Sequence, residues 1–242
     1  MIVLFTDFGL SGPYTGQVIA VLQQAAPEVP IIQLFADAPA GRPKPSAYLL
    51  AAYAGWFPAG TVFLCVVDPG VGSERRPLIA ETDGRVYVGP DNGLFAIVLR
   101  RAASSTVSEI TWRPPTLSAS FHGRDVFAPI AARLAQGEPA VAMAQPVTPA
   151  RCLDWPDDLA EIVYLDRYGN AMTGLRAECV PEAVRLQAGG RTLRHARTFS
   201  AAPSGDAFWY VNSNGLVEIA VNGGRADRAL NLSIGSPVAV LG

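Results

Sequence analysis

The 242-residue chain has few of the residues from which disulfide frameworks and metal centres are built. It contains two histidines and three cysteines, and Cys65, Cys152 and Cys179 lie far apart without paired spacing. An odd number of widely separated cysteines predicts neither a disulfide framework nor a zinc site. Cys65 lies in an apolar run, so we expect it in the core.

Long apolar runs and runs of positive charge are also missing. No stretch approaches the roughly 18 apolar residues of a membrane-spanning helix. The apolar start, residues 1–5, follows no basic region and stops at Thr6 and Asp7, unlike a signal peptide. The formal net charge is −2 and no lysine and arginine run occurs, which argues against nucleic acid and membrane partners. We expect a cytoplasmic protein that acts on a small molecule.

The common nucleotide-binding fingerprints are absent as well. Gly70 and Gly72 frame a Gly-Val-Gly turn that is too short for the dinucleotide motif, and no phosphate-binding lysine loop occurs. These absences argue against NAD enzymes, P-loop enzymes and the common methyltransferase fold. A metal-dependent phosphoesterase is a weaker alternative, because no Asp-x-Asp or His-x-His spacing supports a metal site.

Half of the residues are hydrophobic, which is enough for a sizeable core and for a buried contact between subunits. Over residues 1–145, apolar runs alternate with helical patterns, which predicts an α/β domain with a mainly parallel sheet. The predicted strands are residues 2–5, 61–67 and 85–89. The predicted helices are residues 14–24, 46–56 and 124–136.

Residues 146–158 carry prolines and adjacent aspartates, and we predict a linker there. Residues 159–242 contain short apolar runs and the hairpin dipeptides Gly189-Gly190 and Asn214-Gly215. This pattern predicts a small antiparallel β-barrel or sandwich domain. Its predicted strands are residues 161–165, 183–187, 191–197, 207–212, 216–221 and 237–241.

Three aspartates directly follow predicted strands of the first domain: Asp7, Asp68 and Asp91. If the three strands are parallel, the carboxylates share one edge of the sheet, where open α/β sheets bind ligands. The alternative is that each is a local turn or cap residue.

The loop after the second strand carries Asp68, two glycines, Arg75 and Arg76. Adjacent side chains usually point apart, so we expect only one of the two arginines in a site. His122 precedes a predicted helix and is the better placed histidine. His195 lies between arginines in a predicted hairpin, where we expect it exposed and without a role. The sequence thus predicts an Asp, an Arg and a His acting on one small molecule.

The second domain has polar clusters at residues 165–170 and 211–215. In the first, Asp166, Tyr168 and Asn170 are suited to bind an ammonium group, stack on a base and hydrogen-bond its edge. The second is also compatible with an ordinary turn.

Six motifs in order resemble the S-adenosyl-L-methionine (SAM) hydroxide adenosyltransferases, relatives of the fluorinase and chlorinase enzymes. The resemblance covers nearly the whole chain. The matching segments are Thr6-Asp7-Phe8-Gly9 with Tyr14 and Gly16, residues 67–75, Gly89-Pro90-Asp91-Asn92-Gly93, Phe121-His122-Gly123-Arg124-Asp125, residues 166–170, and Asn212-Ser213 followed by Glu218-Ile219-Ala220-Val221.

The resemblance implies a homotrimer that binds SAM between the N-terminal domain of one subunit and the C-terminal domain of the next. It implies these roles: Asp68, Arg75 and His122 position and activate water, Asp7 binds the ribose, Asp166 faces the methionine ammonium, Tyr168 and Asn170 contact adenine, Ser213 and Asn214 bind the methionine carboxylate, and Phe8 and Asn92 belong to the substrate site.

The implied reaction is hydrolysis of SAM to adenosine and L-methionine by in-line attack of water on ribose C5′. SAM is then the substrate, and neither a metal nor a separate cofactor is expected. The base is Asp68 or His122. The halogenating relatives have a different loop at the position of Asp68. In this chain the Asp68 carboxylate would repel a halide, so we expect hydrolysis, and halide transfer is the alternative reaction. The other alternative is a module that binds SAM or adenosine without turnover.

Residues 35–45 depart from the family pattern, because they lack its usual histidine and acidic residues. We expect this segment to form part of the pocket wall and to affect substrate fit and rate more than the fold.

Overall fold

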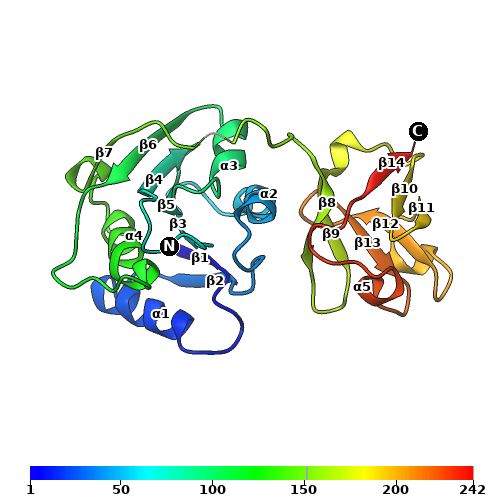
Figure 1. The fold of residues 1–242 in the computed structure, drawn as a ribbon, viewed down its shortest axis with the longest axis horizontal. Helices are drawn as coiled ribbons and strands as arrows, with labels where there is room; N and C mark the ends of the chain where they lie inside the picture. Colours follow the sequence, from blue (N-terminus) through cyan, green and yellow to red (C-terminus); the bar gives the residue numbers. More distant parts are fainter. Residues whose placement is uncertain (151, 242) are drawn as a thin grey trace. The chain divides into compact units, whose positions relative to one another are not determined.

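The computed structural model describes residues 1–150 and 152–241. The chain divides into two compact units: Met1–Leu50 with Ala54–Cys152, and Leu153–Gly242 with Ala51–Tyr53 (Figure 1). Each unit is built on its own seven-stranded sheet. No helix in the described ranges is long and apolar enough to cross a membrane.

The sheet of the first unit has the strand order β2-β1-β3-β5-β4-β6-β7. The first four strands in this order are parallel to one another, and the remaining pairs are antiparallel. The central strands β1 and β3 are buried throughout, as expected for apolar strands covered on both faces. The bounds are β1 (Ile2–Thr6), β2 (Ile31–Phe35), β3 (Val62–Val66), β4 (Pro77–Thr82), β5 (Arg85–Pro90), β6 (Ser105–Ile110) and β7 (Ala144–Pro146).

The prediction of a mainly parallel sheet is therefore wrong, because this sheet is mixed. The cause is a two-residue turn between β4 and β5. Asp83 and Gly84 have φ of 47° and 78°, the left-handed conformation at both central positions of a tight hairpin. Such a turn reverses the chain and makes β4 antiparallel to β5. The Asp-Gly dipeptide was the available signal in the sequence.

Helices pack on this sheet, three of them close to their predicted positions, whereas the helix at residues 96–101 was not predicted. They are α1 (Tyr14–Ala25), α2 (Pro43–Ala54), α3 (Ala96–Arg101) and α4 (Ala128–Ala135), with short helical turns at η1 (Gly123–Phe127) and η2 (Ala140–Ala142). Helices α1 and α4 lie together and bury Leu22 and Ile130 in one core with Leu4 and Leu64 of the sheet. The turn η1 is π-helical and joins directly to α4, so the predicted helix over 124–136 is divided in two.

The sheet of the second unit has the order β14-β10-β11-β12-β13-β9-β8, and β11–β12 is its one parallel pair among the described residues. Its edges approach each other, since Glu161 bridges to Pro237 and the Val238 N–H donates to the Ala160 carbonyl. The prediction of a purely antiparallel barrel or sandwich is corrected to one curled, mixed sheet. The bounds are β8 (Leu159–Leu165), β9 (Ala171–Arg176), β10 (Arg185–Ala188), β11 (Arg191–His195), β12 (Ala207–Val211), β13 (Leu216–Val221) and β14 (Ala239–Leu241), with α5 (Ala226–Ala229), η3 (Ala177–Cys179) and η4 (Phe199–Ala201).

Candidate functional site

Asp7, Asp68 and Asp91 follow three neighbouring strands of the first unit. Strand β3 lies between β1 and β5 and is parallel to both, so the three carboxylates come at the same edge of the sheet. The three strands are thus parallel, which is the condition under which we predicted a shared edge for the three aspartates. The three carboxylates nevertheless have different hydrogen-bond partners, which indicates a different role for each.

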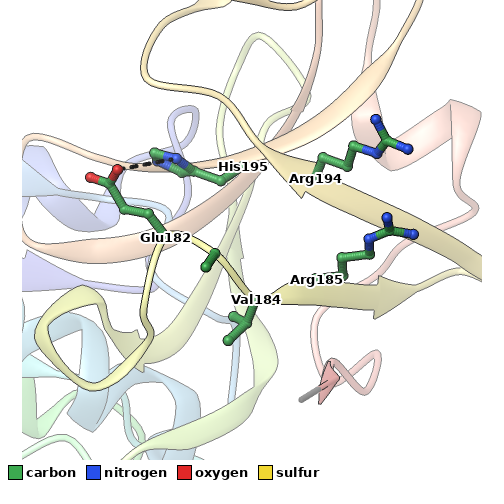
Figure 2. Close-up of a pocket in the computed structure, with 6 residues that line it drawn as sticks. Glu182, Val184, Arg185, Arg194 and His195 are labelled. Atoms are coloured by element: carbon green, nitrogen blue, oxygen red, sulfur yellow. Dashed lines mark ion pairs between the residues drawn. The ribbon is translucent and has the colours of Figure 1, made fainter.

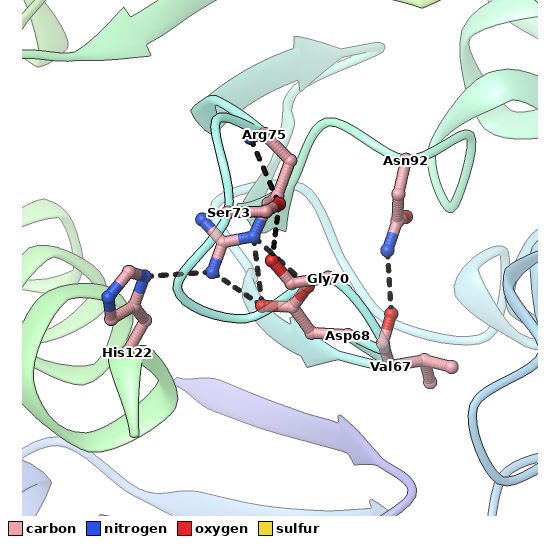
Figure 3. Close-up of polar contacts among 7 residues, drawn as sticks. All are labelled: Val67, Asp68, Gly70, Ser73, Arg75, Asn92 and His122. Atoms are coloured by element: carbon pink, nitrogen blue, oxygen red, sulfur yellow. Dashed lines mark hydrogen bonds and ion pairs between the residues drawn. The ribbon is translucent and has the colours of Figure 1, made fainter. Parts of the chain in front are cut away.

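Asp68 is part of a chain of contacting side chains with Arg75 and the half-buried His122 (Figure 3). The Nε group of Arg75 donates to both carboxylate oxygens of Asp68, at 3.0 and 2.9 Å, and its Nη2 group also donates to Oδ2. The same Nη2 lies 2.9 Å from Nδ1 of His122. The side chains of Arg75 and Asp68 are only 8% and 4% exposed, so water competes little for these contacts.

The loop that carries Asp68 and Arg75 is folded by its own polar groups. The Ser73 N–H and Oγ both donate to the Gly70 carbonyl, at 3.0 and 2.6 Å. Gly72 has φ of +80°, and a Cβ there would lie 2.6 Å from the Ala119 carbonyl oxygen. Both facts require glycine at this position. The loop can therefore turn Arg75 back over Asp68.

The contact with Arg75 fixes the protonation of His122. A guanidinium has donors only, so Nδ1 of His122 must accept, and the proton of the neutral ring is on Nε2. Burial lowers the pKa of His122, and the charge of Arg75 lowers it further. His122 is thus held as a neutral ring with a free donor at Nε2.

Arg76 points away from Arg75, as expected for adjacent side chains. Its Nε donates to Asp91 at 2.9 Å, and its Nη2 donates to Asp91 and to the Thr148 carbonyl. The Ala150 N–H completes the set by donating to Asp91 Oδ1 at 2.9 Å. Asp91 and Arg76 therefore fasten residues 148–150 to the sheet.

Asp7 lies beside the segment 35–45. Its Oδ2 accepts the Gly41 N–H at 2.8 Å, and Gly41 has φ of +62°. Burial raises the pKa of Asp7, although the hydrogen bond from Gly41 opposes this shift. The segment with atypical sequence thus still holds the carboxylate at the end of β1.

A cavity of about 540 Å³ adjoins Asp7. Its aromatic part is formed by Phe8, Tyr14 and Phe121. Phe121 packs edge to face on Phe8 and Tyr14 at centroid distances of 5.8 and 5.5 Å, and the rings of Phe8 and Tyr14 are tilted at 6.1 Å. Of these rings only Phe8 was predicted in the site, because the three come from separate segments of the sequence. The lining residues are Asp7, Phe8, Tyr14, Gln17, Ser118, Ser120, Phe121 and Arg124.

Asn92 uses its amide for backbone contacts. Its Nδ2 donates to the Val67 carbonyl at 2.8 Å, and its Oδ1 accepts the Leu94 N–H at 3.2 Å. Figure 3 shows the first contact next to Asp68. Asn92 therefore supports the end of β3 from which Asp68 projects.

In the second unit, Asp166, Tyr168 and Asn170 lie together at one cavity of about 640 Å³. The backbone N–H and side-chain amide of Asn170 donate to Asp166 at 2.8 and 3.0 Å, which orients the carboxylate. The Tyr168 ring is 75% exposed and therefore accessible to a ligand. Aromatic and polar groups meet here with one carboxylate.

Ser213 and Asn214 lie on the turn between β12 and β13, outside the lining of that cavity. The turn is held by Asn212, whose Oδ1 accepts the N–H groups of Asn214 and Leu216 at 2.9 and 3.0 Å. Asn212 in turn donates to Glu218, which also accepts the Tyr210 hydroxyl, both at 2.7 Å.

Glu218 is 2% exposed, so its charge is removed from water inside the second unit. Burial raises its pKa, the hydrogen bonds from Asn212 and Tyr210 oppose this, and the charge of Asp166 raises it further. No role was predicted for Glu218 from the sequence, although one feature of the sequence sets it apart. The signal was one acidic residue within the apolar run of β13.

Two expectations about single residues are also decided. Cys65 is fully buried, as predicted. His195 is not exposed: its side chain is 13% accessible, with its ring 4.5 Å from that of Trp209. The prediction failed because the packing of Trp209 against β11 is not visible in the local sequence.

Within residues 1–150 and 152–241, no group of three or more His, Cys, Asp or Glu side chains is placed to hold a metal ion.

Comparison with known proteins gives the same family as the sequence motifs. The sequence model of the SAM hydroxide adenosyltransferase N-terminal domain matches residues 2–144, and that of the C-terminal domain matches residues 160–239. The chain belongs to the SAM hydroxide adenosyltransferase family. This confirms the family that the motifs of this chain predicted.

Two relatives match this chain over almost its whole length. The (R)-S-adenosyl-L-methionine hydrolase of Thermus thermophilus is 39% identical over 98% of this chain and 97% of its own. That of Salinispora arenicola is 38% identical over 97% of this chain and 95% of its own.

Solved structures agree on the fold. An uncharacterized conserved protein from Thermotoga maritima has a TM-score of 0.91 at 28% identity and covers all of both chains. A conserved hypothetical protein from Thermus thermophilus has a TM-score of 0.79 at 37% identity and covers 99% of both chains.

Proposed function

We propose that this protein hydrolyses SAM to adenosine and L-methionine. The observation that carries the proposal is the hydrogen-bonded chain Asp68–Arg75–His122, which provides an acceptor, a fixed positive charge and a neutral donor in one place. Relatives named (R)-S-adenosyl-L-methionine hydrolases match nearly the full chain and support the same substrate.

The reaction needs an oriented water more than an acid. As the water oxygen bonds to ribose C5′, the C5′–S bond breaks, and its electron pair leaves with methionine as a neutral thioether. No proton has to reach the leaving group. Water must instead lie in line with the breaking bond and lose one proton, and orientation of this kind is worth up to about 7–11 kcal/mol.

The geometry favours Asp68 as the group that accepts this proton. Nδ1 of His122 already accepts from Arg75, and its Nε2 carries the proton of the neutral ring, so His122 has no free lone pair. His122 then orients the water by donating to its oxygen. Arg75 stabilises the negative charge that develops on that oxygen in the buried site.

The same carboxylate favours hydrolysis over halide transfer. A halide at C5′ would lie close to the charge of Asp68, and its repulsion is weakly screened because the Asp68 side chain is only 4% exposed. We therefore propose that water, and not chloride, is the nucleophile.

The family resemblance supports the substrate contacts. We assign Asp7 to the ribose hydroxyls, with Phe8 beside it, and Asp166 to the methionine ammonium. Tyr168 and Asn170 contact adenine, and Ser213 and Asn214 bind the methionine carboxylate. Asn92 acts indirectly, through the strand end that bears Asp68. SAM is the substrate, and no separate cofactor takes part.

We further propose a homotrimer in the cytoplasm, with each site formed by the first unit of one subunit and the second unit of the next. The support for this assembly is the resemblance to the SAM hydroxide adenosyltransferase family.

The activity is tested by chromatography of the purified protein after incubation with SAM, without added metal, in chloride-free and chloride-containing buffer. Equal adenosine in both buffers is the expected result. A chlorinated nucleoside would make the protein a halide adenosyltransferase. SAM bound without any product would leave a binding module.

Shared sites are tested by mixing Asp68→Asn, which lacks the proposed base, with Asp166→Ala, which lacks the ammonium contact. The mixture is made under conditions in which subunits exchange and is assayed at a limiting SAM concentration at which each variant alone has little activity. Random exchange in a cyclic trimer restores both halves in about one quarter of the sites. A double variant mixed with either single variant restores none and is the control. No recovery from the single variants, despite verified exchange, would place each site within one subunit.

A further inference from the structure

The hairpin of β10 and β11 has a charge unlike that of the rest of the chain. Residues 183–205 contain Arg185, Arg191, Arg194 and Arg197 and no acidic residue, although the chain as a whole has a formal net charge of −2. This hairpin lies outside every segment used in the proposed hydrolysis. Its positive charge therefore needs an explanation of its own.

Arg185 and Arg194 lie directly opposite each other on the two strands. The antiparallel register pairs Leu186 with Leu193, which places the next pair outward, Arg185 and Arg194, face to face. Figure 2 shows both side chains projecting in the same direction from adjacent strands. Like charges directly opposite on a sheet destabilise it, unless an anion lies between them.

Neither guanidinium makes an ion pair or side-chain hydrogen bond with any residue in the described part of the chain. Other arginines of the same unit have such partners: Arg176 pairs with Asp158 and Arg225 with Asp227. The donors of Arg185 and Arg194 are thus available to a ligand.

A cavity of about 480 Å³ adjoins the pair. Its one carboxylate, Glu182, faces His195 at 3.7 Å instead of the arginines, as Figure 2 shows. The side chain of His195 is in turn packed against Trp209. The negative charge in the cavity therefore does not neutralise Arg185 and Arg194.

We propose that Arg185 and Arg194 form a binding site for the phosphate or pyrophosphate group of a soluble small molecule. Two guanidiniums on neighbouring strands offer forked donors that match the oxygens of such a group and supply two positive charges. The site shares no lining residue with the cavity of Asp166, so it is separate from the proposed SAM contacts of the second unit.

The proposal is tested by calorimetric titration of the whole protein with inorganic phosphate and with pyrophosphate at low ionic strength. Chloride at matched ionic strength controls for screening. Saturable binding at one site per chain is expected. Arg185→Gln and Arg194→Gln should each weaken it by about tenfold or more, as expected for lost hydrogen bonds between charged groups, and the double variant should abolish it.

Arg191→Gln is the matched control, because Arg191 lies on the same hairpin at its turn, opposite Ala188. Binding by this variant should be unchanged. The melting temperature gives a second readout: pyrophosphate should raise it in the wild type and not in the double variant. Absence of saturable binding, or an equal loss in Arg191→Gln, would overturn the site. Binding of only RNA or anionic vesicles would overturn it too.

Discussion

Nη2 of Arg75 donates a hydrogen bond of 2.9 Å to Nδ1 of His122. Because this contact requires a lone pair on Nδ1, it is compatible only with the neutral ring. The same guanidinium holds both oxygens of Asp68. One arginine thus sets the tautomer of the histidine and the direction of the carboxylate, and the chemistry of the site depends on its position.

Protonation of His122 should therefore abolish activity at acidic pH. Burial and Arg75 lower the pKa of His122 below its ordinary value of about 6.5. Activity should be full above that value and fall as pH drops through the lowered pKa. The free energy of unfolding should also fall as pH drops through this range, because the unfolded chain has the higher His122 pKa and binds the proton more readily than the folded chain. The measurement is log kcat/KM against pH.

His122→Gln is the control for this assignment. A glutamine can accept from Arg75 and donate to water without titrating in this range. The activity of this variant should be lower overall, but the fall in activity at acidic pH that is due to His122 should be absent. An unchanged limb in this variant would assign the titration to another group, such as Asp7, whose pKa is raised by burial.

Asp68 and Asp91 follow neighbouring parallel strands and allow a matched comparison. Asp68→Asn removes the proposed proton acceptor, so kcat should fall by about a hundredfold or more, while SAM binding is largely kept. Asp91→Asn weakens the contacts with Arg76 and Ala150. It should lower the free energy of unfolding by about 1–3 kcal/mol with little change in kcat. Kinetics and denaturant unfolding of both variants decide this, and the reverse pattern would exchange their roles.

Gly41 and Gly60 test the role of the segment 35–45. Both have positive φ and donate their N–H groups, Gly41 to Asp7 and Gly60 to the Gly84 carbonyl. Alanine should cost about 1–2 kcal/mol at either position because of the left-handed conformation. Only Gly41→Ala should also raise KM for SAM, since only Gly41 orients Asp7. Equal KM values for the two variants would separate Asp7 from substrate binding.

The sequence predicted three of the four parallel strands of the first sheet, and residues 2–5 and 61–67 were the clearest because they are apolar at nearly every position, as strands buried on both faces must be. The edge strand β2 was not predicted, and its four residues before Phe35 are only half-buried or exposed. The sequence also allowed the three aspartates to be placed at one edge. The antiparallel part was missed because residues 77–82 were not recognised as a strand. Their direction depends on the left-handed turn at Asp83 and Gly84.

The contacts within the candidate site were less predictable. Residue types and order suggested Asp68, Arg75 and His122, but they could not choose between Asp68 and His122 as base. The proposed choice of Asp68 rests on which nitrogen of His122 faces Arg75, and this depends on the fold of residues 68–75 and on the turn at Gly123. Glu218 was missed because its partner Asn212 is reached across a hairpin and not along the chain.

Glu218 is expected to act on substrate binding through Asn212, which holds the turn of Ser213 and Asn214. A carboxylate accepts from Tyr210 and Asn212 at once, whereas a glutamine at this position has only one acceptor oxygen. Glu218→Gln therefore leaves one buried donor unpaired, which costs about 1–3 kcal/mol. It should raise KM for SAM more than it changes kcat, because the proposed contact of Ser213 and Asn214 is with the methionine carboxylate and not with the bond that breaks.

Tyr210→Phe separates this effect from a general loss of packing between β12 and β13. It removes only the phenol donor and leaves the bond between Asn212 and Glu218 in place. KM should then stay close to the wild-type value, even if the melting temperature falls. If Tyr210→Phe raises KM as much as Glu218→Gln, the effect comes from the packing of the two strands and Asn212 does not transmit it. A rise in KM for Glu218→Gln alone means that the buried carboxylate positions the turn.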